Sequence, residues 1–267
     1  RRWTLLSLSA LVLFGLVATP TQAATTYVWS GATDSDFSLA SNWSGGSVPV
    51  SGNAPAMANN RITVGGSGVT PVNPLIYGDA QGHTIYNSND RALFIASGLP
   101  GQMSIAGGIF ESQATIPDGL SNNAAGSLSI DGGSYVNTNG SGAKTFLMVW
   151  GGSSGNGTVT INSGSFAVDT LRWGDTTGSS GTGTVYLNGG TLSVKNFVDG
   201  AAATSNVYFN GGDLVALGSS ASFMPSNMNN VYVSDGGARI NTAGFDVTAA
   251  MDLQHDPAGA ATDGGLT

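Results

Sequence analysis

A short phrase of alternating residues that ends in a doublet of small residues occurs six times in this chain. It reads Val-Tyr-Leu-Asn-Gly-Gly at residues 185–190 and Val-Tyr-Phe-Asn-Gly-Gly at residues 207–212. The doublets end at positions 108, 133, 164, 190, 212 and 237, so successive copies are separated by 25, 31, 26, 22 and 25 residues. A repeat of this length, made of strands and turns, predicts a β-solenoid in which each copy stacks on the preceding one.

Alternation within the phrase indicates strands with one buried face. Val159 and Ile161 are expected to point inward and Thr160 outward, because successive side chains of a strand lie on opposite faces. A looser apolar run precedes several copies and a third run follows the doublets. Each repeat therefore supplies about three short strands, which predicts an all-β parallel β-helix over residues 91–250.

The end of each phrase is typical of a tight corner. Asn and Asp tolerate the left-handed conformation and bond to nearby backbone, and glycine completes such a corner at little steric cost. Equivalent residues of stacked turns lie about 4.8 Å apart, so each kind forms a column. We favour this structural role over glycan or metal binding for the predicted corner residues, which are Asp131, Asn162, Asn188, Asn210, Gly133, Gly164, Gly190 and Gly212.

Composition and the first residues indicate an exported, acidic protein. Arg1 and Arg2, an apolar run and small residues up to Ala24 follow the order of a secretory signal peptide, predicted for residues 1–24. The chain has 8 basic and 16 acidic side chains, and removal of Arg1 and Arg2 leaves 6 against 16, a net charge of −10. Nucleic acid is therefore not an expected partner, because phosphate binding needs clustered Lys and Arg.

The segments on either side of the repeats depart from the pattern. Residues 25–90 are expected to form an N-terminal cap and the first irregular turns, with Trp29, Phe37 and Trp43 covering the otherwise open edge. Residues 251–267 are predicted to start a further repeat region of a longer protein, because the alternation is interrupted at residues 254–257 and no capping segment follows to cover the open edge of the last turn.

The phrases at residues 157–166 and 183–192 resemble the repeats of bacterial autotransporter-type passenger domains. The start at residues 29–49 is similar to the start of many such proteins, and residues 246–248 and 263–267 are similar to the lead-in of the autotransporter-associated β-strand repeat. The resemblance implies a right-handed parallel β-helix at the cell surface or secreted, with an adhesive or structural role. It implies no catalytic residues.

An enzyme is the alternative from another class, because parallel β-helices also cleave polysaccharides. Such enzymes need convergent carboxylates, often with a basic residue. On the repeats, the candidate catalytic group is Asp169, Arg172 and Asp175. We favour a surface ion pair for this group. The sequence has no cofactor motif and no metal-site spacing, so neither a cofactor nor a metal is expected.

Aromatic residues give a third interpretation, a carbohydrate-binding module. Tyr186, Tyr208 and Tyr232 share the outward parity and are expected to form a vertical stripe, while Trp150 and Trp173 precede glycines in successive turns. Such columns stack on sugar rings or dock a partner, but they also stabilise neighbouring strands, and we favour this second role. The expected partners are surface glycans or other surface proteins, with no membrane span in the mature chain.

Overall fold

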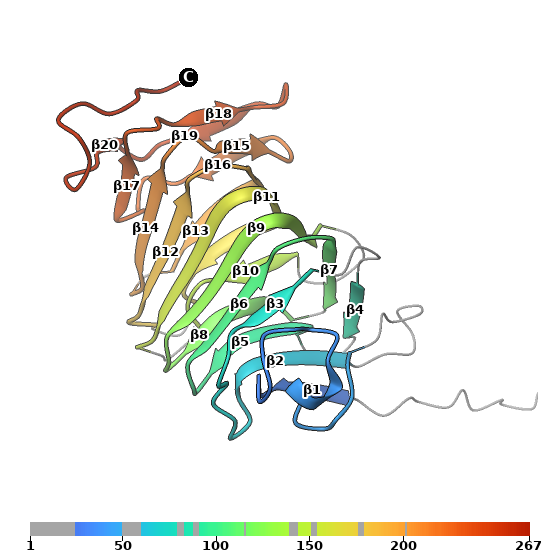
Figure 1. Cartoon of the computed structure of the whole chain (residues 1–267). Coiled ribbons are helices and arrows are strands. Elements are labelled where there is room, and N and C mark those ends of the chain that lie inside the picture. Colours follow the sequence, from blue (N-terminus) through green and yellow to red (C-terminus); the bar gives the residue numbers. More distant parts are fainter. Residues whose placement is uncertain are drawn as a thin grey trace, which may run out of the picture.

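The computed structural model describes residues 25–49, 60–78, 83–87, 91–114, 116–138, 144–150, 154–175, 179–200 and 202–267. These residues form a β-solenoid of about 6 turns, built from stacked parallel strands (Figure 1). The predicted parallel β-helix is thereby confirmed. The signal peptide predicted for residues 1–24 lies outside the described residues.

The repeated phrase forms the first of three columns of parallel strands, here called column A. Column A contains β3 (Leu75–Tyr77), β6 (Gly101–Ile105), the first part of β9 (Gly126–Asn137), the first part of β11 (Asn156–Trp173), β12 (Thr182–Leu187), β14 (Thr204–Phe209), β17 (Asn230–Val233) and β20 (Gln254–His255).

The apolar run after each doublet forms column B. Column B contains β4 (His83–Asn87), β7 (Ile109–Ala114), the later part of β9, the middle of β11, the first part of β13 (Thr191–Asp199), β15 (Asp213–Ala216) and β18 (Arg239–Asn241).

The run before each phrase forms column C. Column C contains β1 (Thr25–Trp29), β2 (Asn60–Gly66), β5 (Leu93–Ser97), β8 (Asp118–Asn122), β10 (Thr145–Leu147) and the last parts of β11 and β13. The strands β16 (Ser220–Met224) and β19 (Val247–Ala249) pair with each other in a separate two-stranded sheet.

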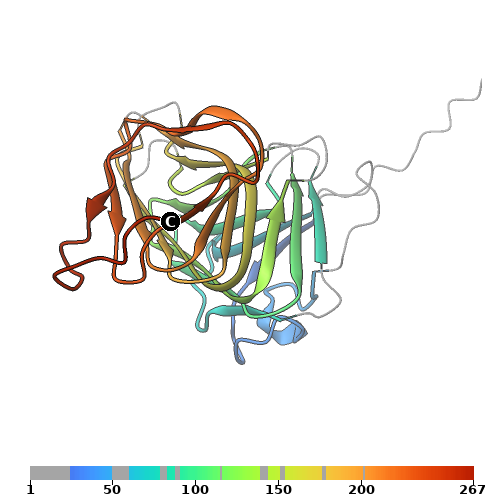
Figure 2. The ribbon, with the colours of Figure 1, turned by 90° about the horizontal axis from the view of Figure 1, so that it is seen from above.

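Strand register follows the repeat and builds a single core. Val159 pairs with Val185, which pairs with Val207, which pairs with Val231, and all four side chains are buried. Buried hydrophobic residues from all three columns belong to one cluster. Seen along the solenoid, the chain winds around this interior (Figure 2). Burial of aligned apolar side chains is the main favourable term for a fold of this kind.

The doublets stack directly on one another at the corner between columns A and B. Gly164 has a φ of +80° and Gly190 a φ of +61°, values that favour glycine. A Cβ atom on Gly190 would lie 2.6 Å from the carbonyl oxygen of Gly164, and one on Gly212 would lie 2.6 Å from that of Gly189. The corner therefore needs glycine for its close packing as well as for its backbone angles.

Aromatic side chains of the segment after β1 pack over the first turn. Trp43 lies 5.0 Å from Trp29 and 5.4 Å from Phe37 between ring centroids, in edge-to-face arrangements, and all three are buried. A parallel bridge joins Asp36 to Ile76 of β3. The segment thus lies along the edge of β3 opposite to β6, and covers a strand edge that would otherwise be open to pairing.

Candidate binding groove

The outward face of column A carries a continuous stack of tyrosines. Tyr186 lies 4.9 Å from Tyr208 between ring centroids, with 23° between the ring planes, and Tyr208 lies 5.0 Å from Tyr232 with 33° between them. Thr160 and Ser129 occupy the same column in the two preceding turns. The structure therefore places the three tyrosines in the stripe that the alternation predicts.

A ladder of side-chain hydrogen bonds runs beside the tyrosines at the corner. Nδ2 of Asn162 donates to Asp131 at 2.8 Å, Nδ2 of Asn188 donates to Asn162 at 3.0 Å, and Nδ2 of Asn210 donates to Asn188 at 3.4 Å. The backbone N–H of Gly236 donates to Oδ1 of Asn210 and extends the ladder to the next turn. Five turns are thereby tied together by bonds outside the backbone ladder between strands.

The acidic residue at the foot of the ladder stays ionised. Burial of the Asp131 carboxylate opposes its charge, but hydrogen bonds from Ser104, Ser129 and Asn162 outweigh burial and hold its pKa below the ordinary value. Asp131 therefore accepts hydrogen bonds from the turn below it, its own turn and the turn above it.

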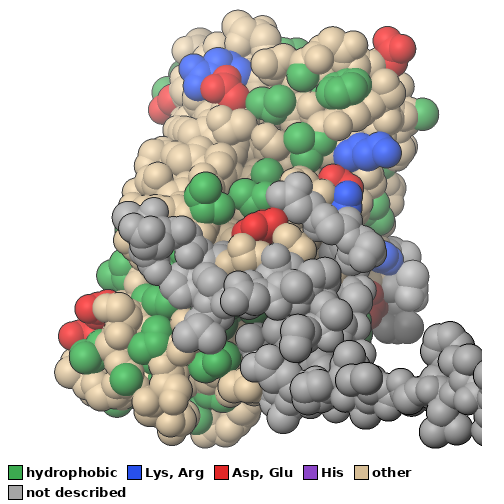
Figure 3. Space-filling model, turned by 90° about the vertical axis from the view of Figure 1, so that its right-hand side faces the viewer, with side chains coloured by type: hydrophobic (Ala, Val, Ile, Leu, Met, Phe, Trp, Pro, Cys, Tyr) green, Lys and Arg blue, Asp and Glu red, His purple; other side chains and the backbone are tan. Residues whose placement is uncertain are grey.

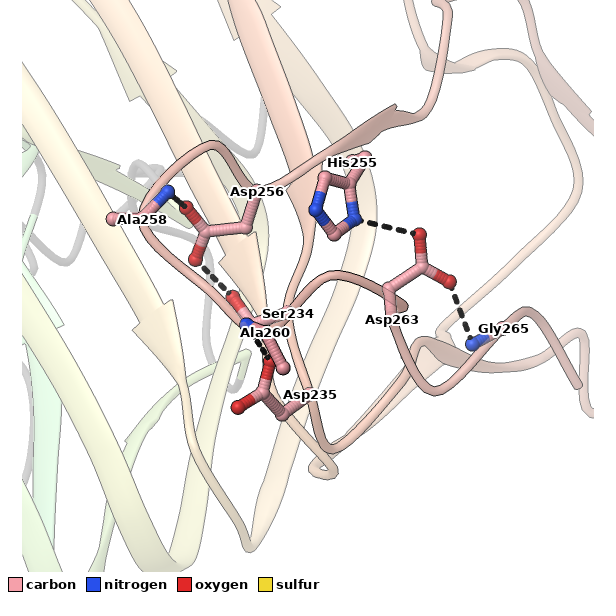
Figure 4. Close-up of polar contacts among 8 residues, drawn as sticks. All are labelled: Ser234, Asp235, His255, Asp256, Ala258, Ala260, Asp263 and Gly265. Atoms are coloured by element: carbon pink, nitrogen blue, oxygen red, sulfur yellow. Dashed lines mark hydrogen bonds and ion pairs between the residues drawn. The ribbon is translucent and has the colours of Figure 1, made fainter.

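A loop near the C-terminus folds back beside the same face of column A (Figure 4). Asp256 accepts hydrogen bonds from Oγ of Ser234 at 2.6 Å and from the N–H of Ala258 at 3.0 Å. Asp235 accepts one from the N–H of Ala260 at 2.7 Å. Carboxylates thus hold the loop against the corner that follows β17.

Hydrogen bonding also keeps the Asp256 carboxylate of this loop, which forms one wall of the site, in its charged form. The Ser234 hydroxyl, followed by the Ala258 N–H, holds the pKa of Asp256 below the ordinary value although this residue is only 8% exposed. Nearby, Nδ1 of His255 lies 3.2 Å from Oδ2 of Asp263, which also accepts from the N–H of Gly265 through Oδ1. Asp256 is therefore negatively charged at neutral pH.

Between this loop and the tyrosine stripe lies a groove with a volume of about 390 Å³. Its volume falls in the lower part of the range for ligand sites, roughly 300–1,000 Å³. We call it the Tyr–Asn groove; it is lined by Tyr186, Asn188, Tyr208, Asn210, Ser234, Asp235, Asp256, Ala258 and Gly259.

Tyr208 lies at the centre of this arrangement. Burial, followed by the neighbouring Tyr186, Tyr232 and Asp256, raises the pKa of its hydroxyl, so the phenol stays neutral over the physiological range. Tyr186 at the open end is 36% exposed. Together the two residues present an aromatic surface beside the carboxylates of the loop.

Trp173 is not a surface aromatic residue, so the interpretation that places it in an exposed aromatic column is wrong. Its side chain is fully buried and its Nε1 donates to the carbonyl of Gly183 at 2.8 Å. Leu171 and Trp173 are two residues apart on a strand, so both face the core. Leu147 pairs with Arg172, which puts Trp173 beside Met148 and not beside Trp150.

Trp150 is half-buried and one face of its ring is covered. The guanidinium of Arg91 lies 3.8 Å from the ring centroid of Trp150 and 4.4 Å from that of Phe94. This cation–π packing occupies one face of the ring, on which a sugar could otherwise stack. Trp150 and Trp173 therefore do not form the predicted aromatic pair.

The candidate catalytic residues engage in local bonds. Asp169 lies 3.9 Å from the Nζ of Lys144, in a partly exposed ion pair. Nε of Arg172 donates to the carbonyl of Gly174 at 2.8 Å, and the N–H of Asp175 donates to the Oγ of Ser179 at 3.3 Å. Asp169 thus forms a surface ion pair, but its partner is Lys144 rather than Arg172.

Sequence reasoning missed the loop side of the groove. Asp256 lies within the run at residues 254–257 that interrupts the alternation, and in the sequence this interruption indicates only the start of a further repeat region. Ser234 takes the place of the asparagine of the regular phrase and Asp235 is an extra residue before the doublet, which was the available signal that this corner differs from the others. The hydrogen bonds of Asp256 with Ser234 and of Asp235 with Ala260 form only because the loop folds back over more than twenty residues. No local repeat in the sequence predicts such a contact.

The described part of the chain contains no cluster of three or more His, Cys, Asp and Glu residues able to hold a metal ion. Across the same residues, no helix has the length and hydropathy needed to cross a bilayer. Comparison with known protein families, curated proteins and solved structures found no match.

Proposed function

We propose that this chain is an exported, adhesin-like β-solenoid of the autotransporter-passenger type that acts by binding at the bacterial surface and not by catalysis. The observation that carries the proposal is the Tyr–Asn groove on one face of a continuous parallel ladder. A scaffold tied by three columns of strands and by the asparagine ladder holds such a face rigidly, which reduces the entropy lost when a partner binds.

Surface composition supports adhesion. Only 9% of the residues are charged, so a partner approaches without displacing many strongly hydrated groups. On the face shown in Figure 3, most of the described surface is uncharged, with small groups of acidic and basic side chains. The proposed partners are surface glycans or surface proteins, and the groove favours the former.

The test uses beads coated with the purified full-length chain. We expect them to be retained on layers of bacterial cells or immobilised cell-surface polysaccharide more strongly than albumin-coated beads, and retention to disappear when the chain is unfolded by heat. Retention no greater than with albumin contradicts the adhesive role. Release of new reducing ends from the polysaccharide, abolished by Asp169→Asn, would establish the enzymatic alternative.

Export is tested separately by expression of the full-length chain in a bacterial host. A mature N-terminus close to residue 25 and digestion of the chain by protease added to intact cells are the expected results. An uncleaved chain that is protected inside the cell contradicts the surface location.

A further inference from the structure

The Tyr–Asn groove combines neutral hydrogen-bonding groups with a negatively charged wall. Among the described residues that line it there is no Lys or Arg, whereas Asp235 and Asp256 contribute carboxylates. The whole chain carries a net charge of −8. A ligand that bears carboxylate or sulfate groups would meet like charges in the groove and lose affinity.

The asparagines of the groove retain hydrogen-bonding capacity beyond the ladder. An asparagine amide has two N–H donors and two acceptor lone pairs. Asn188 uses one donor toward Asn162 and one lone pair toward Asn210, and Asn210 uses one donor toward Asn188 and one lone pair toward Gly236. Each amide therefore keeps one donor and one acceptor. Adjacent donor–acceptor pairs of this kind match the hydroxyl groups of a sugar.

The groove also repeats along the solenoid. Tyr186 with Asn188, and Tyr208 with Asn210, are the same pair of groups in successive turns. Successive turns lie about 4.8 Å apart, which is comparable with the length of one pyranose unit in an extended glycan. Tyr186 stacks on Tyr208 and Tyr208 on Tyr232, so the tyrosines present the edges and hydroxyl groups of their rings to a ligand.

We infer that the Tyr–Asn groove binds an uncharged oligosaccharide segment that lies along the solenoid axis, with consecutive sugar rings against consecutive turns. Asn188 and Asn210 bond the hydroxyl groups, the ring edges and hydroxyl groups of Tyr186 and Tyr208 contact the sugar rings, and the carboxylates of the loop accept hydroxyl hydrogens while rejecting acidic sugars. The inference deepens the proposed adhesive function and rests on it for its biological use, but the binding step is measured independently of adhesion.

The experiment titrates the full-length chain by calorimetry with cellotetraose, maltotetraose and mannotetraose as neutral probes. Tetragalacturonate serves as the acidic probe and chitosan tetramer as the cationic one. We expect at least one neutral probe to bind with a Kd between about 10 μM and 1 mM, and tetragalacturonate to bind at least about tenfold more weakly. Failure of all three neutral probes, or tighter binding of either charged probe, overturns the inference.

Variants then place the binding in the groove. Tyr208→Ala is expected to weaken the neutral probe about tenfold, whereas Thr160→Ala, in the same outward column but outside the groove, leaves the Kd unchanged. Because Tyr208→Ala also removes ring stacking between turns, Ala258→Trp provides a second test. It fills the groove from an exposed loop position and is expected to abolish binding with the melting temperature retained.

If the Kd of the neutral probe is unchanged in both Tyr208→Ala and Ala258→Trp, the assignment of binding to the Tyr–Asn groove is overturned. If the coated beads still adhere while none of the neutral probes binds, the groove inference fails and the adhesive function stands. If the probes bind but the beads do not adhere, the groove inference stands and the adhesive function fails.

Discussion

The hydroxyl of Tyr135 donates a 2.6 Å hydrogen bond to Oδ2 of Asp118 inside the solenoid, where both side chains are fully buried. Oδ1 of the same carboxylate accepts the backbone N–H groups of Ala92 at 2.8 Å and Leu93 at 2.9 Å. Burial raises the pKa of Asp118 and, together with the neighbouring carboxylate, raises that of Tyr135. One carboxyl group thus joins columns B and C and satisfies the start of β5.

We expect Asp118→Ala to reduce the free energy of unfolding by about 3 kcal/mol, because it leaves two buried N–H groups and one phenol without an acceptor. The matched variant Tyr135→Phe removes only one donor and should cost about 1–2 kcal/mol. Urea denaturation followed by circular dichroism measures both values. Equal losses in the two variants would show that the backbone bonds to Asp118 contribute little.

Alanine substitutions at two glycines with similar backbone angles distinguish the cost of backbone strain from the cost of lost close packing. Gly164 has a φ of +80° and Gly46 a φ of +64°, but a Cβ atom on Gly164 would fall on the carbonyl of Gly133 whereas one on Gly46 would meet nothing within 4 Å. Gly46→Ala should therefore cost about 1 kcal/mol from backbone strain alone. Gly164→Ala should cost about 3 kcal/mol or more, since the stacked turns must move apart.

Thermal and urea unfolding of these two variants give the comparison. Similar losses for Gly164→Ala and Gly46→Ala would contradict the close stacking of the doublets, because strain would then account for both.

The asparagine ladder is expected to contribute to stability through Asn162. Asn162→Ala removes its bond to Asp131 and the bond from Asn188, and should cost about 1–2 kcal/mol. Loss of one donor should also raise the pKa of Asp131, which carbon-13 NMR of the carboxyl groups can follow. Thr160→Ala on the same strand, with an expected change within about 0.5 kcal/mol, is the control. An unchanged pKa of Asp131 would rule out the ladder bond in solution.

Asp199 is expected to make stability depend on pH near neutrality. Burial raises its pKa to about 6, although it accepts a hydrogen bond from Ser205. The folded state then holds a proton that the unfolded state releases, so this contribution is complete below about pH 4 and is lost as the pH rises through 6.

Asp199→Asn should therefore stabilise the chain at pH 7.5 by about 1 kcal/mol, a value reduced for the partial exposure of the side chain, and should have little effect at pH 4. Melting temperatures across this range measure the effect, with Asp169→Asn as the control at a surface ion pair. A stabilisation of the same size at both pH values would contradict titration of Asp199 near 6.

Much of the fold follows from periodicity. Period two along Val159–Ile161 and the repeat of 22 to 31 residues define which side chains enter the core and which turns stack, because a one-residue slip would expose every apolar side chain of a strand. The same reasoning should have placed Trp173 inside with Leu171. The tyrosine stripe and the Asn162–Asn210 ladder could likewise be predicted from the sequence, since both are columns of equivalent positions.

The sequence by itself determined the columns, because a stacked coil brings identical positions together whatever the exact length of its turns. Only the tertiary structure decided the groove. Its outer wall depends on Asp256 reaching Ser234 and on Asp235 reaching Ala260, contacts made once by an irregular loop. Burial of the apolar side chains recurs in every turn, so the buried positions can be predicted from the repeat in the sequence. The closing of a single loop depends on the energy of a few hydrogen bonds in three dimensions, and it leaves no period to read.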